Sequence, residues 1–109
     1  MGRLVVLAKD ADSISVIDAD TGETTRTVET DFNPHEVAVG PGGEEVYVTC
    51  SLGGSLIVYD ADTWERAETI THEDFDFPHG LAVRKSAGEL WLASTATGSA
   101  GPGRLPASR

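Results

Sequence analysis

The sequence predicts an all-β protein built from repeated four-stranded units, and two observations lead to this prediction. The first is a repeat, because residues 13–50 return in similar form as residues 55–94. The second is the alternation of apolar and polar residues, as in "SISVID" from Ser13 to Asp18, which is typical of strands. Four short strands that recur at a spacing of about 40 to 45 residues are typical of β-propeller blades.

The two repeats align in two halves. In the first half, "DADT" at 18–21 returns as "DADT" at 60–63, an offset of 42 residues. In the second half, Pro34-His35 returns as Pro78-His79 at an offset of 44, because two residues are inserted within "THEDFDF". Residues 3–8 also align with 45–50, so the chain begins in a partial repeat.

The residues of each segment predict the strands one by one along the chain. Apolar alternation marks the strands before the Asp-Ala-Asp-Thr turn, Thr-rich segments mark polar outer strands, and "HEVAVG" suits a closely packed inner strand. We expect strands at 4–8, 13–18, 24–29, 36–40, 45–50, 55–60, 66–71, 80–84 and 89–93. These are about two four-stranded blades plus one strand, in a repeat module over 3–94. The Gly/Pro-rich tail 95–109 is expected to be disordered.

These motifs resemble a known repeat. "PHEVAV" and "PHGLAV", then "EVYVT", then "SLIVYDADT" are similar to the YVTN-type β-propeller repeat, although Tyr47 to Cys50 read YVTC where the family has Asn last. The resemblance covers Arg3 to about Ser94. It implies propeller blades whose inner strand is the Val-Ala-Val one. It leaves the activity open, because such propellers serve as surface-layer proteins, sensors, lactonases and dehydrogenase subunits.

Two blades do not close a propeller, which typically has about four to eight. Open faces and strand edges would therefore be covered by other polypeptide. One resolution is a homo-oligomer, head to tail, in which three or four copies form a closed ring. The other is that these residues belong to a longer propeller. We expect assembly.

The charge and the composition exclude several classes of protein. Asp and Glu number 18 against 8 Lys and Arg, a formal net charge of −10, so we expect no nucleic-acid or anionic-membrane partner. The apolar run Leu4 to Ala8 is too short for a membrane span or a secretory signal. We therefore expect a cytoplasmic protein if the chain is complete, and the location is otherwise open. The single Cys50 cannot form an internal disulfide.

Two equivalent histidines are the first candidate site. His35 and His79 both follow proline at an inner strand, where they would face the central channel, and imidazole is a common ligand of zinc and copper. Alternatively, Pro-His is a structural turn whose imidazole bonds to the next blade. Glu36 would add a carboxylate, but Gly80 replaces it in the second repeat.

The inserted loop "HEDFDF", residues 72–77, is the second candidate. Phe75 and Phe77 among acidic residues could bind a cationic ligand, or they could fill a gap between blades, as Phe32 in the matching loop suggests. The Asp18 and Asp60 turns could bind Ca²⁺ but lack a complete calcium-loop pattern, so turn formation explains them.

The sequence favours a non-enzymatic repeat module, a self-assembling scaffold or a ligand-binding or protein-binding domain, without a cofactor. The alternative is a lactonase-type or lyase-type enzyme with a divalent metal at His35, His79 and Glu36. A third reading is a truncated piece without a function of its own. We further expect Trp91 to lie in the core between blades and Trp64 to be more exposed.

Overall fold

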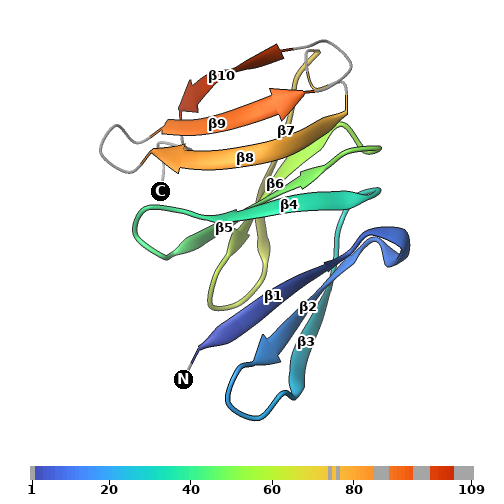
Figure 1. Cartoon of the computed structure of the whole chain (residues 1–109), viewed down its shortest axis with the longest axis vertical. Coiled ribbons are helices and arrows are strands. Elements are labelled where there is room, and N and C mark those ends of the chain that lie inside the picture. Colours follow the sequence, from blue (N-terminus) through green and yellow to red (C-terminus); the bar gives the residue numbers. More distant parts are fainter. Residues whose placement is uncertain (1, 74, 76, 85–88, 95–98, 105–109) are drawn as a thin grey trace.

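Three antiparallel sheets follow one another along the chain (Figure 1). The structure is a computed structural model, and it describes residues 2–73, 75, 77–84, 89–94 and 99–104. The first sheet holds β1 (Arg3–Ala8), β2 (Ser13–Asp18) and β3 (Thr24–Glu29), with a short 3₁₀ helix η1 (Lys9–Ala11) after β1. The central sheet holds β4 (Pro34–Val39), β5 (Glu45–Cys50), β6 (Ser55–Asp60) and β7 (Arg66–Thr71). The third holds β8 (Pro78–Arg84), β9 (Glu89–Ser94) and β10 (Ser99–Arg104).

The all-β prediction is confirmed, and the nine expected strands are present. The two inner strands begin earlier than expected, at Pro34 and Pro78. Both histidines therefore lie within the strands. Among the described residues, no helix has the length and apolar character needed to cross a membrane.

In the segment 95–109, which was expected to be disordered, the structure describes only Ser99–Arg104. Within it, Ser99–Arg104 forms β10, which pairs with β9 from Ser99–Ser94 to Arg104–Glu89. Its position matches that of β6 beside β5 in the central sheet. Strand pairing uses backbone N–H and C=O groups, so a segment without apolar alternation can complete the edge of a sheet. Residues 95–98 and 105–109 lie outside the described residues.

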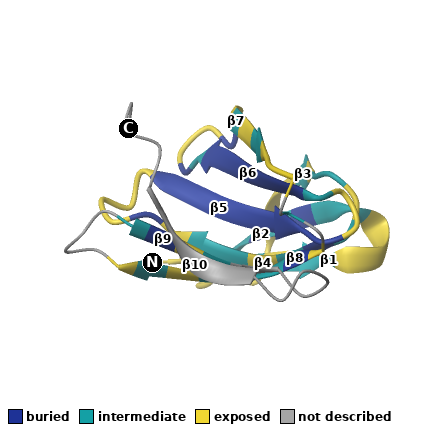
Figure 2. Ribbon diagram, turned by 90° about the horizontal axis from the view of Figure 1, so that it is seen from above, coloured by how far each residue is buried: buried dark blue, intermediate teal, exposed yellow. Residues whose placement is uncertain are grey.

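Two core layers lie on the two faces of the central sheet, whose strands β5 and β6 are the most buried part of the chain (Figure 2). Successive residues of a strand face opposite sides. Thus Val46 and Val48 of β5 pack toward the first sheet, whereas Tyr47 packs toward the third. The first core layer consists of Ile14, Val16, Val46, Val48, Cys50, Ile57, Tyr59, Ala61 and Trp64. The second core layer consists of Tyr47, Leu56, Val58 and Leu90, with Leu81, Val83 and Leu92 packed against it.

The backbone repeats more strictly than the sequence does. Positive φ angles recur at positions related by the repeat, although the residues there differ. The pairs are Gly22 (74°) with Trp64 (59°), Asp12 (52°) with Gly54 (64°), and Asn33 (63°) with Phe77 (66°). The turn conformation is therefore a property of the repeat. Where a non-glycine residue occupies one of these positions, its positive φ is unfavourable in free energy.

The outer faces of the two flanking sheets carry large apolar side chains that are exposed. On β1, Val5 and Leu7 pack against the first core layer, so Leu4 and Val6 lie on the opposite face, where they are 54% and 46% exposed. On β9, Trp91 likewise lies opposite Leu90 and Leu92, and 39% of it is exposed. The expectation that Trp91 lies in the core is therefore wrong within one chain, because no described sheet covers that face.

Candidate functional site

Each candidate histidine sits in a β-bulge. In the pairing of β4 with β5, Pro34 faces Cys50 and Glu36 faces Thr49, so His35 is an extra residue on β4. His79 occupies the same irregularity between β8 and β9. A bulge bends the strand and re-aims the side chain of the inserted residue. The repeat therefore gives both imidazoles the same local geometry.

The structure brings these two histidines together with Phe77. The ring centroids of His35 and His79 are 5.7 Å apart, with an interplanar angle of 82°. The Phe77 ring lies 6.5 Å from each imidazole. Nδ1 of His35 is buried and has no hydrogen-bond partner among the described residues, whereas Nδ1 of His79 lies 3.5 Å from the carbonyl oxygen of Phe77. We refer to His35 and His79 as the histidine pair.

Glu36 does not join the histidine pair to form a larger cluster. It is exposed on β4, in register with Thr49. In the described part of the chain, no group of three or more His, Cys, Asp and Glu side chains could hold a metal ion. The histidine pair therefore consists of two imidazole rings without a carboxylate in the same cluster.

The three phenylalanines have different environments. Phe75 is half-buried against the second core layer, with its ring 5.9 Å from that of His72, which agrees with the gap-filling interpretation. Phe77 is 38% exposed and packs beside the histidine pair. Phe32 is 67% exposed, so the matching loop does not fill a gap in the same way.

The Asp-Ala-Asp-Thr segments form hydrogen-bonded turns. Oδ1 of Asp18 accepts hydrogen bonds from the N–H groups of Asp20 and Thr21, and Asp60 does the same with Asp62 and Thr63. The backbone N–H groups of Thr63 and Asp62 lower the pKa of Asp60. These contacts match the turn interpretation of both segments.

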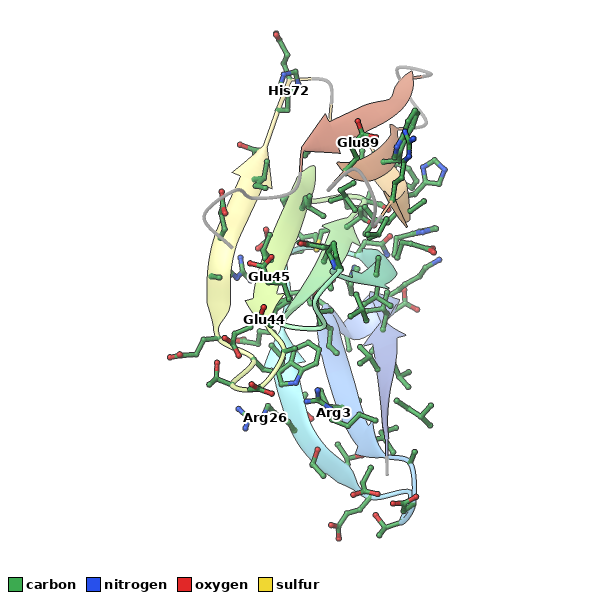
Figure 3. All side chains as sticks on the ribbon, turned by 90° about the vertical axis from the view of Figure 1, so that its left-hand side faces the viewer. Arg3, Arg26, Glu44, Glu45, His72 and Glu89 are labelled. Carbon is green, nitrogen blue, oxygen red and sulfur yellow. The ribbon has the colours of Figure 1, made fainter. Side chains whose placement is uncertain are left out.

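Trp64 closes the second of these turns and is buried, not exposed as expected. Only 6% of it is exposed, and its ring lies 5.7 Å from that of Tyr59 in the first core layer. Two arginines of the first sheet reach the same turn. Arg3 donates to the Ala61 carbonyl and Arg26 to the Thr63 carbonyl, each at 2.7 Å (Figure 3). The turn thus joins the first two sheets.

A polar network at the junction of the first and central sheets was missed by the sequence analysis. Asp31 accepts a hydrogen bond from Ser55 Oγ at 2.7 Å and pairs with Arg66 at 3.1 Å. Burial alone would raise the pKa of Asp31, but the Ser55 and Arg66 hydrogen bonds lower it overall.

Arg66 also lies 6.0 Å from the Tyr59 ring centroid, and the Tyr59 hydroxyl donates to the Glu29 carbonyl at 2.8 Å. Burial raises the pKa of Tyr59 to about 12.

The sequence carries no signal for this network, because its two charged members, Asp31 and Arg66, do not repeat. Asp31 aligns with Phe75, and Arg66 aligns with Thr24. Beside the network lies a pocket of about 320 Å³, lined by Asp12, Thr30, Asp31, Phe32 and Gly53. Both of its carboxylates already have protein partners, because Asp12 accepts from the Asn33 N–H at 2.8 Å. The pocket therefore offers no uncommitted carboxylate.

Cys50 is not a candidate nucleophile. It is completely buried in the first core layer, and burial raises the pKa of its thiol. A thiol reacts through its thiolate, so both effects suppress its reactivity.

Comparison with known proteins supports the fold. Neither a protein-family profile nor a curated protein sequence matches the chain. Three of the similar solved structures are hydrazine synthase of Kuenenia stuttgartiensis (TM-score 0.79, 23% identity), the WD40 β-propeller domain of Doa1 (0.73, 17%) and virginiamycin B lyase of Staphylococcus aureus (0.67, 17%). The matches cover 86%, 86% and 96% of this chain.

The chain spans only part of each of these proteins, namely 26%, 30% and 38% of their length. At these identities the likeness concerns the fold alone. The expected propeller fold is confirmed, and the described residues form part of a β-propeller with three successive sheets.

Proposed function

We propose that this chain is a non-enzymatic propeller repeat module of the YVTN type that assembles head to tail with further copies of itself into a scaffold ring. The observation behind this proposal is the equivalence of its exposed and buried faces. Leu4 and Val6 align with Val46 and Val48, which are buried against the first sheet. Trp91 aligns with Tyr47, which is buried against the third sheet.

The two exposed faces are therefore complementary to each other. The face that carries Trp91 corresponds to the side of a blade that contacts the next blade. The face that carries Leu4 and Val6 corresponds to the side that contacts the preceding one. Contact between the Trp91 face of one copy and the Leu4 face of another would repeat the blade interface that the chain already forms twice. Such a heterologous interface can close into a ring.

The third sheet changes the preferred number of copies. The expectation of three or four copies follows from counting about two blades in each chain. Because β10 makes the third sheet a unit of three strands, each copy contributes three sheets. Two copies then supply six sheets, within the typical range of about four to eight blades. We therefore propose a dimer.

The molar mass in solution tests this proposal, measured by light scattering on a sizing column. The expected result is a single species of twice 11.5 kDa. Val6→Asp and Trp91→Asp, one on each face, should both give monomers, because each places a charge in the apolar interface. Leu52→Asp is the matched control, since Leu52 is 68% exposed in the loop after β5.

A monomeric wild-type chain would overturn self-assembly. The apolar faces would then be covered by blades of a longer polypeptide, and the function would belong to that whole protein. Assembly that survives both charged substitutions would also contradict the proposed interface.

A further inference from the structure

We infer that the histidine pair is a binding site for one divalent transition-metal ion, such as zinc or copper. Both ligands come from one chain, so the inference does not depend on self-assembly. The adjacent inner strands β4 and β8 present the two imidazoles from equivalent bulges. Imidazole nitrogen is a preferred ligand of zinc, copper and nickel, whereas Mg²⁺ and Ca²⁺ prefer oxygen.

The ring separation fits a shared ion. With zinc–nitrogen bonds of about 2.0–2.1 Å, two imidazoles on one tetrahedral ion have ring centroids about 5 Å apart. The observed separation of the ring centroids is 5.7 Å, close to this value. The remaining coordination positions would be taken by water, which leaves an open site.

His79 lies near a backbone carbonyl group, as many metal-binding histidines do. Such a residue usually donates its second ring N–H to a carbonyl or carboxylate, and this bond selects the tautomer that keeps the other nitrogen for the metal. Nδ1 of His79 lies 3.5 Å from the carbonyl oxygen of Phe77, a position from which it can make such a contact. Phe77 has a positive φ of 66°, and this backbone conformation sets the position of its carbonyl group.

His35 supplies the second observation. Its Nδ1 atom is buried and lacks a hydrogen-bond partner among the described residues. Native structures rarely retain a buried polar atom without a partner unless an ion or a water lies at the site, because the hydration that the atom loses is not otherwise replaced. The ring centroid of His79 lies 5.7 Å from that of His35, and an ion between the rings would engage both residues.

Metal titration of the intact chain tests the inference. Isothermal titration calorimetry with CuCl₂, ZnCl₂ and MgCl₂ should show one Cu²⁺ or Zn²⁺ per chain, with Cu²⁺ bound more tightly and Mg²⁺ not bound. His35→Ala and His79→Ala should each weaken binding more than the roughly 10–100-fold typical of losing an outer-shell contact. Electron paramagnetic resonance of the Cu²⁺ form should report two nitrogen ligands in the wild type and one in each variant.

His72→Ala is the matched control, because His72 is the third histidine of the sequence and projects from the end of β7 (Figure 3). It should bind metal like the wild type. Circular dichroism of each variant separates lost ligands from lost fold. The inference would be overturned if the wild type bound neither Cu²⁺ nor Zn²⁺, or if binding survived in a variant that carries both His35→Ala and His79→Ala. Loss of binding in His72→Ala would overturn it as well. None of these outcomes bears on the dimer, which molar mass tests.

Discussion

Trp64 combines a favourable and an unfavourable contribution to stability, and substitution can separate them. The side chain is 6% exposed in the first core layer, and truncation of a buried Trp typically costs about 3–5 kcal/mol. Its backbone has a φ of 59°, a left-handed conformation that costs a non-glycine residue about 1–2 kcal/mol. Trp64→Ala should therefore lower the free energy of unfolding by about 3–5 kcal/mol. Trp64→Gly should lose about 1 kcal/mol less than Trp64→Ala, because glycine tolerates positive φ.

The first repeat provides the matched control. Gly22 is the equivalent residue, with a φ of 74°, and a Cβ added at this position would meet no other side chain or backbone atom within 4 Å. Gly22→Ala therefore measures the conformational cost without a packing change, and we expect it to lose about 1 kcal/mol or slightly more. Urea unfolding followed by circular dichroism measures all three variants. The reasoning is refuted if Trp64→Gly is less stable than Trp64→Ala, or if Gly22→Ala costs nothing.

Two further predictions concern the central sheet and its junction. Gly40→Ala would place a Cβ 2.9 Å from the hydroxyl oxygen of buried Tyr47, so we expect a loss of about 1–3 kcal/mol in urea unfolding, and an unchanged midpoint would contradict this. The pKa of Asp31 is lowered in the folded state, so its contribution to stability is present at neutral pH and is lost as the pH falls below its ordinary value of 3.8. Asp31→Asn should therefore be less stable than the wild type at pH 7, and the difference should shrink in acid; a difference independent of pH would argue against the Arg66 pairing.

Much of the fold could be predicted because the repeat encodes each strand locally. The Asp18 and Asp60 side chains form the turns that their sequence predicts, and the alternation on β5 places Val46 and Tyr47 on opposite faces. Strand β10 could not be predicted in this way. It is held by backbone pairing with β9, which leaves no apolar pattern to recognise.

The candidate site was only partly accessible from the sequence. The repeat identified His35 and His79 as equivalent, but their proximity depends on how β8 packs beside β4. The Asp31–Arg66 pair joins residues 35 positions apart that have no counterpart in the other repeat. Only the packing of two sheets brings them together.

The sequence by itself determined the all-β class, the repeat, most strand positions and the equivalence of the two histidines, because period-2 patterning and turn residues act over a few neighbouring positions. The tertiary structure decided which residues are buried. Trp64 is buried because Tyr59 and the first sheet surround it, and Trp91 is exposed because no described sheet covers its face. Burial depends on neighbours distant in the chain, and local sequence does not specify whether those neighbours are present.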